Sequence, residues 1–167
     1  MKLVIHPDQL LREKSERITD IDGEIVDLAE QMITTMHEAR GIGLAGVQVG
    51  VLKRLFVAHV DRDEPRVFIN PSILETSMEQ VPHEEGCLSI PAIYATVTRP
   101  ESIRVQAWNE RGRPFTVTLD GLLARVFQHE YDHLNGVLFL DHLAEATRDQ
   151  VMADYDPITN AASVGNS

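Results

Sequence analysis

The sequence lacks the features that mark secreted or membrane proteins. It has one cysteine, Cys87, among 167 residues, so no intrachain disulfide can form, which is typical of a reducing cytosol. No apolar run approaches the roughly 20 residues of a membrane-spanning helix. The apolar run Leu3 to Ile5, which ends at His6 and Pro7, is too short for a signal-peptide core. We therefore expect a cytoplasmic protein without a membrane segment.

Basic residues are also scarce. Lys and Arg total 15 against 26 Asp and Glu, and the formal net charge is −11. Binding to nucleic-acid phosphates needs clustered Lys and Arg, so direct nucleic-acid binding is not expected. Hydrophobic residues make up 43% of the chain, which is ordinary for a globular protein. The length predicts one compact domain with a core large enough to hold a pocket.

The pattern of apolar residues predicts two helices separated by strands. The first helix runs from about Glu24 to Arg40, where apolar residues recur at spacings of three and four; Asp20 or Asp22 caps it and Gly41 ends it. The second runs from Gly121 to Leu134. Short β-like runs lie between them: Leu52–Val60, Arg66–Ile73, Ile103–Trp108 and Phe115–Leu119. This order predicts an α+β fold. The polar segment after Leu143 is expected to fray, and the alternative is a short helix over Ala144–Tyr155 that packs Val151 and Met152 on the body.

The second helix carries the pattern His129-Glu130-Tyr131-Asp132-His133. Histidines at i and i+4 project from one helical face, close enough to hold a single metal ion. Glu130 lies about 100° around the helix from His129, so it is poorly placed as a ligand but well placed as a general base. A surface helix that carries two histidines by coincidence is the alternative.

A third ligand must come from outside this pattern. In the metzincin peptidase motif the third histidine would fall at position 139, where this chain has Phe. The downstream candidates, none of them marked out by its context, are Asp141, His142, Glu145 and Asp149. Upstream, Cys87 lies in the more specific string Glu84-Glu85-Gly86-Cys87-Leu88-Ser89. A thiolate binds divalent metals strongly, and three protein ligands plus water make an open, catalytic site. A lone cysteine can also be a small buried apolar residue.

A glycine-rich segment runs from Gly41 to Gln48. Gly41, Gly43 and Gly46 satisfy the dinucleotide-binding pattern, but that pattern needs a strand before it and a helix after it. Here the predicted order is reversed, so we reject nucleotide binding. The glycines instead indicate a backbone that passes close to a ligand or to another strand, or a loop that only turns.

Together the three segments resemble the signature motifs of the peptide deformylase family. They read Gly41-Ile42-Gly43-Leu44-Ala45-Gly46-Val47-Gln48, Glu85-Gly86-Cys87-Leu88-Ser89 and His129-Glu130-Tyr131-Asp132-His133. Their order and spacing match, and the resemblance extends to about Leu143. It implies antiparallel β-sheets packed around a central metal-binding helix, with an N-terminal helix. It also implies a catalytic domain over residues 1–143 and a polar tail over 144–167.

The resemblance assigns roles to residues at the matching positions. Cys87, His129 and His133 would bind the metal, and Glu130 would be the acid–base. The Gln48 amide and the Leu88 backbone N–H would face the developing oxyanion. Two positions depart from the family pattern. Gly46 replaces the usual second alanine, which would loosen the strand that carries Gln48, and Tyr94 stands where some members have a substrate-contacting arginine.

A side-chain pocket is also predicted. Leu122 and Val126 share one stripe of the second helix with His129 and His133, so apolar atoms continue directly from the metal ligands. Ordinary core packing is the alternative. Gly43 and Gly86 are further candidates for contact with the substrate, and the resemblance adds Ile42.

The implied reaction removes the N-formyl group from the formylmethionine of newly made polypeptides and releases formate. The family's physiological metal is Fe²⁺, and the mixed ligands would also accept Zn²⁺, Ni²⁺ or Co²⁺. The expected partners are formyl-methionyl nascent peptides, with transient proximity to the ribosome. The tail has one basic and five acidic residues from Asp141 onward, a balance of 1 − 5 = −4, so we do not expect it to dock on RNA. The competing hypotheses are a zinc peptidase with a downstream carboxylate ligand and a metal-stabilised binding domain without enzymatic activity.

Overall fold

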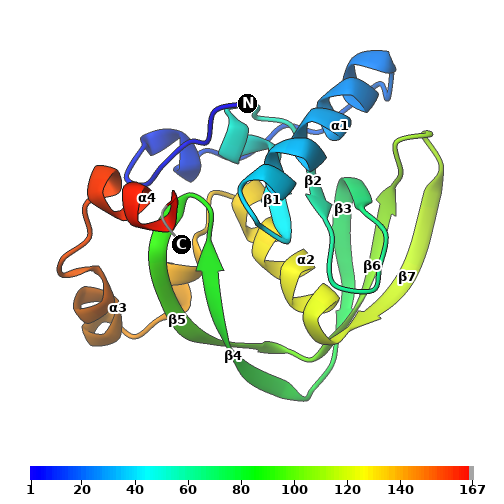
Figure 1. Ribbon diagram of the computed structural model, residues 1–167. Coiled ribbons are helices and arrows are strands. Elements are labelled where there is room, and N and C mark those ends of the chain that lie inside the picture. The colour runs from blue at the N-terminus through cyan, green and yellow to red at the C-terminus, as the bar shows by residue number, and fades with distance from the viewer. Residues whose placement is uncertain (166–167) are drawn as a thin grey trace.

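A computed structural model describes residues 1–165 of the chain. In this part, strands β1, β2, β3, β6 and β7 form an antiparallel sheet in that order, and β4 and β5 form a separate hairpin. Figure 1 shows helix α2 (Gly121–Leu134) between these two layers. The strands are β1 Gly43–Ala45, β2 Leu55–Ala58, β3 Arg66–Thr76, β4 Gln80–Cys87, β5 Ile90–Pro100, β6 Ser102–Trp108 and β7 Pro114–Asp120. The predicted α+β fold is confirmed.

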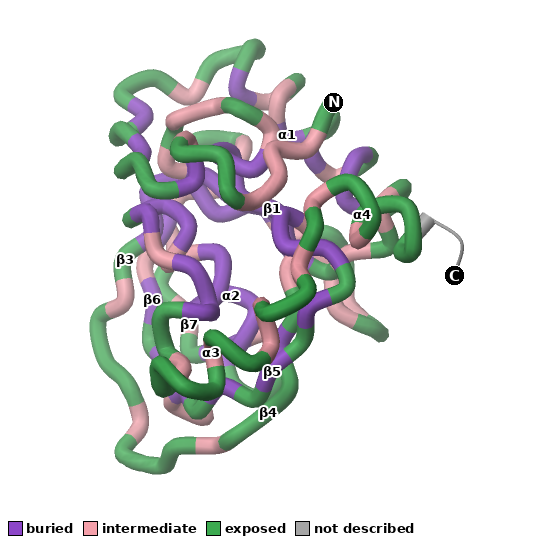
Figure 2. Tube along the Cα trace, turned by 90° about the vertical axis from the view of Figure 1, so that its left-hand side faces the viewer, coloured by how far each residue is buried: buried purple, intermediate pink, exposed green. Residues whose placement is uncertain are grey.

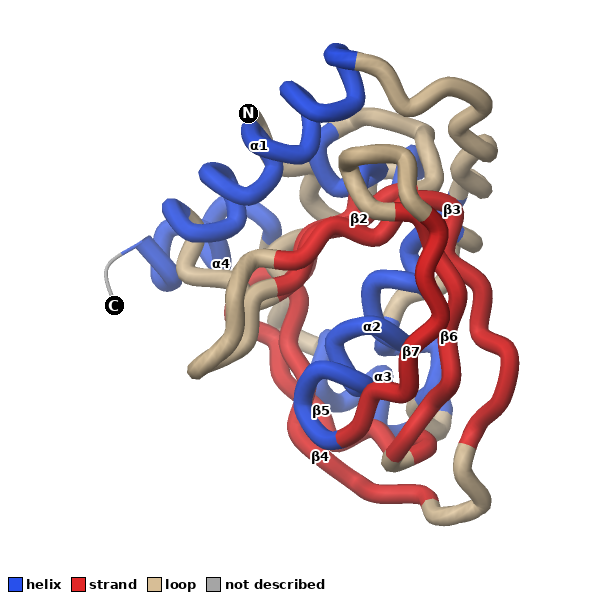
Figure 3. Tube along the Cα trace, turned by 90° about the vertical axis from the view of Figure 1, so that its right-hand side faces the viewer, coloured by secondary structure: helices blue, strands red, loops and turns tan. Residues whose placement is uncertain are grey.

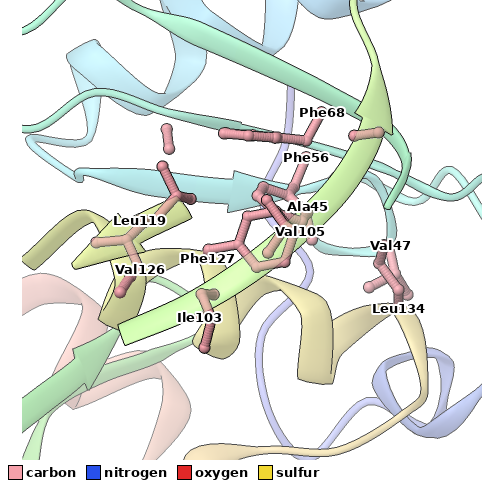
Figure 4. Packing of buried hydrophobic residues seen from close by; sticks show 13 residues of the cluster. Ala45, Val47, Phe56, Phe68, Ile103, Val105, Leu119, Val126, Phe127 and Leu134 are labelled. Carbon is pink, nitrogen blue, oxygen red and sulfur yellow. The ribbon is translucent and has the colours of Figure 1, made fainter. Parts of the chain in front are cut away.

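Helix α2 occupies the predicted range and is buried along most of its length. Its inner face packs on the five-stranded sheet, and the rings of Phe56, Phe68 and Phe127 meet there with centroids 5.0–5.1 Å apart. Figure 4 shows this cluster between the strands and α2, and Figure 3 shows α2 behind β6 and β7. An α-helix that is buried on several sides holds its side chains rigidly, which suits a metal centre.

The opposite face of the sheet is covered by α1 (Gly23–Glu38). Side chains of β2 alternate between the two cores. Leu55 and Val57 point towards α1, whereas Phe56 and Ala58 point towards α2. Asp22, one of the two predicted caps, accepts a hydrogen bond from the Ile25 N–H at 3.2 Å. The left-handed residue that ends α1 is not the expected glycine.

That residue is Arg40, with φ 59°, and Gly41 follows it. Gly41 has a close neighbour instead: a Cβ there would lie 2.6 Å from a methyl carbon of the Leu88 side chain. The glycine therefore permits close approach between the end of α1 and the β4–β5 turn.

The β4–β5 hairpin was not predicted from the sequence. In β5 the buried residues Ile93, Ala95 and Val97 alternate with exposed ones, which is the signal that was available. In β4 the inward position is occupied by the charged Glu85, and this conceals the pattern. The hairpin, with Leu11 and Phe139, encloses a third core.

The segment after Leu143, expected to fray, contains two helices, α3 (Glu145–Met152) and α4 (Pro157–Gly165). Val151 and Met152 pack on the third core, and the Tyr155 hydroxyl donates to the His6 carbonyl at 2.8 Å. Figure 2 shows that both helices are largely exposed, in contrast to the buried α2. The last two tail positions, 166 and 167, lie outside the described residues. Three 3-10 turns complete the elements: η1 Gln9–Arg12, η2 Gly46–Val49 and η3 Phe139–His142.

Within residues 1–165, none of the helices combines the length and apolar character that crossing a membrane requires.

Candidate metal centre

The three predicted ligands converge between α2 and the hairpin. Candidate ligand atoms of Cys87, His129 and His133 all lie within 4.8 Å of one another, and the Cys87 Sγ is 3.3 Å from the His133 Nε2. No other group of His, Cys, Asp and Glu side chains in the described part of the chain meets in this way. One thiolate and two imidazoles suit Fe²⁺, Zn²⁺, Co²⁺ or Ni²⁺ and leave a coordination position open. The residues present therefore fit a catalytic divalent metal.

The sequence brings these ligands together by two local devices. Helical periodicity places His129 and His133 on one face of α2, and their ring centroids are 5.1 Å apart. At the end of β4 the register shifts, so that Gly86 pairs with Tyr94 but Cys87 pairs with Ile90. Such an irregularity re-aims a side chain relative to the strand. Here it accompanies the contact of Cys87 with α2.

Glu85 orients His129. Its Oε1 lies 2.9 Å from the His129 Nδ1, which leaves the Nε2 of that ring available to a metal. Arg99 donates two hydrogen bonds to the same carboxylate, at 2.6 and 3.0 Å, and Arg125 donates one at 2.6 Å. Burial would raise the pKa of Glu85, but the bonds from His129 and Arg99 hold that pKa well below its usual range. The carboxylate is therefore ionised and His129 has a fixed partner.

This ionic network extends to the surface. Arg99 also donates to Asp132 at 3.0 Å, and Asp132 contacts the ring of His142 at 2.8 Å. Sequence reasoning missed Glu85 and Arg99 as site residues. Their signal was a charged residue at an inward position of each strand, since buried charges are rare unless they are paired.

Glu130 is buried beside the ligands, and its Oε1 has no hydrogen-bond partner. Burial raises the pKa of Glu130 to about 7, in spite of the nearby His129. A carboxyl that titrates near neutral pH can both accept and release a proton. Gly43 makes room for it, because a Cβ at that position would collide with the Glu130 carboxylate and lie 2.8 Å from a methyl group of Val126.

Gln48 lies in η2, not in a strand as expected. Its Oε1 accepts from the Ala45 N–H at 2.8 Å, so the amide is held with its nitrogen towards the centre. The Nε2 donates to the Ser89 Oγ at 3.1 Å and to the Cys87 Sγ at 3.5 Å. A buried amide donor fixed in this way costs little reorganisation when charge develops beside it.

The expected loosening at Gly46 is not what the structure presents. Gly46 starts η2, and a Cβ there would lie 2.8 Å from the Val51 carbonyl oxygen and 3.0 Å from that of Lys53. Glycine allows this close backbone contact, and in this chain an alanine at position 46 would push η2 away from the Val51–Lys53 backbone. Tyr94 lies across the hairpin from Gly86, where a Cβ would meet the Tyr94 ring at 2.7 Å.

A cleft of about 730 Å³ opens beside the metal-ligand cluster. Cys87, His129, Glu130, Gln48 and Leu88 line it. The predicted substrate contacts all line it as well: Ile42, Gly43, Gly86, Leu122 and Val126. His83 also borders the cleft. Leu88 lies in the β4–β5 turn, at the edge of the second core.

Two of the downstream ligand candidates, Asp141 and His142, are engaged elsewhere. Asp141 binds Arg12 at 2.6 Å and accepts from the Leu138 N–H at 2.9 Å. His142 contacts the carboxylate of Asp132 at 2.8 Å. No downstream carboxylate joins the Cys87 cluster in the described residues, so the geometry does not support the zinc-peptidase hypothesis.

Three protein ligands with an open position, next to a buried carboxyl of raised pKa, are the arrangement of a hydrolytic metal centre rather than a structural one. The fold and the site thus define a metal-dependent hydrolase. Comparison with known proteins identifies the family. The family model described as polypeptide deformylase matches residues 1–149. The chain belongs to the peptide deformylase family, the metal-dependent enzymes that remove the N-formyl group from nascent polypeptides.

Individual relatives agree over nearly their whole length. A peptide deformylase from Agrobacterium fabrum is 48% identical over 163 residues, which is 95% of this chain and 96% of the relative. The crystal structure of a peptide deformylase from Legionella pneumophila has 38% sequence identity to this chain and a TM-score of 0.90. The match covers 97% of this chain and 96% of the Legionella chain. A Synechococcus elongatus deformylase in complex with actinonin is 42% identical, with 92% and 86% coverage and a TM-score of 0.88.

Proposed function

We propose that this chain deformylates formylmethionyl peptides at a centre held by Cys87, His129 and His133, with Fe²⁺ as the physiological metal. The convergence of one thiolate and two imidazoles within 4.8 Å, beside Glu130, is the observation that carries the proposal. Zn²⁺, Ni²⁺ or Co²⁺ would occupy the same ligands in a purified sample, because Zn²⁺ binds such sites more tightly than Fe²⁺. A bound divalent metal supplies the charge that lowers the pKa of water from about 15.7 towards about 7.

Glu130 is the proposed acid–base. It takes a proton from the water that attacks the formyl carbon, and it delivers that proton to the amine nitrogen as the C–N bond breaks. The products are formate and a peptide with a free methionine amine. Burial raises the pKa of Glu130, which supports this role, since an efficient proton carrier titrates near the working pH.

Gln48 and the Leu88 backbone N–H are the proposed oxyanion donors. Attack on the formyl carbonyl concentrates negative charge on its oxygen, and a fixed N–H aimed at that atom contributes roughly 3 kcal/mol. The hydrogen bond from the Ala45 N–H holds the Gln48 amide in one orientation, which supports this role. Ser89 and Cys87, its present acceptors, keep the amide nitrogen directed at the cleft.

The methionine side chain is proposed to bind against Leu122, Val126 and Ile42. Leu122 and Ile42 are 43% and 44% exposed, unusual for large apolar residues, and both line the cleft. An unbranched thioether gains contact area there without needing a polar partner. Gly43 and Gly86 also line the cleft, which supports the proposal that the peptide backbone passes beside them.

The test pairs Glu130→Gln with Cys87→Ser. We expect Glu130→Gln to retain the metal and to lose most turnover of a formylmethionyl peptide, because an amide cannot carry the proton. Cys87→Ser should lose the metal, since a serine hydroxyl replaces a thiolate ligand. Metal content measured by elemental analysis separates the two effects. Full turnover by metal-loaded Glu130→Gln would refute the proposed acid–base.

We also propose that the enzyme works in the cytoplasm, where newly made chains emerge, and that its tail is not a ribosome anchor. From Asp141 to the end the chain has five acidic residues and one basic residue, Arg148. RNA phosphate would repel this segment. Ribosome pelleting at low and high salt, with wild type and Arg148→Ala, should show no difference in binding. A salt-dependent loss in the variant would contradict the proposal.

A further inference from the structure

Helix α4 lies against the hairpin that carries Cys87. Asp156 begins it, with the Oδ1 accepting from the N–H groups of Ile158 and Thr159 at 3.0 and 2.9 Å. The Asn160 side chain then donates to the carbonyl of Pro91 in β5 at 3.0 Å. Figure 1 shows α4 beside the β4–β5 turn. The helix is therefore attached to the strand that borders the cleft.

Two apolar residues of α4 line the cleft that Cys87 and His129 also line. Ala161 and Val164, spaced i and i+3, share one helical face, and both contribute to the cleft wall. Val164 is 38% exposed, and two other exposed apolar residues of the cleft, Tyr94 and Leu122, are 58% and 43% exposed. Apolar surface is thus open to solvent on α4, on the hairpin and on α2, around a common space.

The cleft is larger than one residue requires. Clefts of about 300–1,000 Å³ hold whole drug-sized ligands, and this one measures about 730 Å³. A formylmethionine hydrolysed at the proposed centre would occupy only the part next to Cys87 and Glu130. The remaining apolar wall, which includes Ala161, would stay exposed unless the chain that follows methionine covers it.

We propose that α4 is a specificity wall for the peptide: Ala161 and Val164 contact side chains of the residues that follow formylmethionine and favour apolar ones. This inference rests on the proposed deformylase function and adds the part of the substrate that the C-terminal helix reads. It makes the tail a part of the binding site, although the sequence there is polar and resembles no catalytic motif.

The experiment changes charge on α4 and follows substrate preference. Substrates are formylmethionyl-alanyl peptides that end in two leucines, two lysines or two glutamates. Ala161→Asp should raise the lysine-to-leucine ratio of kcat/KM by about fivefold or more, because charges within about 4 Å interact even in water. Ala161→Lys should raise the glutamate-to-leucine ratio instead. If the substitutions only damaged the structure, Ala161→Asp and Ala161→Lys would not shift the substrate preference in opposite directions.

Ala162 supplies the matched control. It is exposed, adjacent on the same helix and absent from the cleft wall, so Asp or Lys there imposes similar costs on helix stability. Ala162→Asp and Ala162→Lys should keep the wild-type ratios. If both Ala161 variants still turn over the peptides with wild-type kcat/KM ratios, the proposed role of α4 is overturned but the proposed deformylase function is not. No turnover of any formylated peptide by metal-loaded wild type would overturn the proposed function instead.

Discussion

Replacing Arg125 by methionine should destabilise the protein far more than a surface arginine does. Arg125 is buried on α2, and its guanidinium donates to Glu85 at 2.6 Å and to the carbonyls of Val97 and Val81 at 2.9 and 2.6 Å. The side chain joins the central helix to both strands of the hairpin. Methionine keeps most of the apolar stem and removes the charge and all three hydrogen bonds.

The magnitude follows from burial. Side-chain exposure is 9% for Arg125 and 4% for Glu85, and removing one partner of such a buried pair costs about 3–5 kcal/mol. In the variant Glu85 keeps Arg99 and His129 as partners, so the loss in the free energy of unfolding should be about 3 kcal/mol, the lower end of that range. That is a large share of the total stability of a domain.

Arg104→Met is the matched control. Arg104 approaches Glu75 only to 4.0 Å, and the two side chains are 52% and 71% exposed. Such a pair contributes less than about 1 kcal/mol. Urea unfolding of the metal-free proteins at neutral pH gives both free energies on one scale. Equal losses in the two variants would refute the argument that the buried network holds the hairpin to α2.

Three further changes test the site and the termini. Gln48→Ala should lower kcat by about 10²–10³ if the amide faces the oxyanion, and a change confined to KM would make it a ground-state contact. Gly43→Ala should displace the Glu130 carboxylate, the proposed acid–base, and reduce kcat by about 10² with a folded protein, whereas Gly41→Ala meets only a flexible leucine end and should cost far less. Burial would raise the pKa of Asp141, but its hydrogen bonds, first the one from Arg12, hold that pKa below its value in the unfolded chain. The Arg12–Asp141 pair therefore stabilises the fold at pH values above the unfolded pKa of the aspartate. The difference in urea midpoint between wild type and Arg12→Met should therefore narrow as the pH falls below about 4; a constant difference would contradict this.

Helix α2 and its chemistry were accessible from the sequence because both are local. The bounds Gly121–Leu134 follow from a stop at Asn135 and Gly136 and from apolar spacing, and the structure has the same bounds. Helical geometry then fixes the relative positions of His129 and His133 without knowledge of the rest of the fold. The choice of Cys87 as the third ligand needed the family motifs, because no local rule relates residues 42 positions apart.

Tertiary structure decided the features that depend on pairing and burial. The hairpin was missed because Glu85 and Arg99 point inward, where the strand pattern calls for apolar residues, and only the folded chain shows that they neutralise each other. The same holds for Gly43, whose missing side chain makes room for Glu130.

The polar C-terminal segment forms helices because Tyr155 and Asn160 find carbonyl acceptors on distant parts of the chain. The sequence by itself determined the residue types of the proposed metal site, the central helix and the α+β class, because these depend on residue chemistry and short-range periodicity. The orientation of His129, the raised pKa of Glu130 and the wall built by α4 were decided only by the tertiary structure. Each depends on which groups are excluded from water together, and that is a property of the assembled fold.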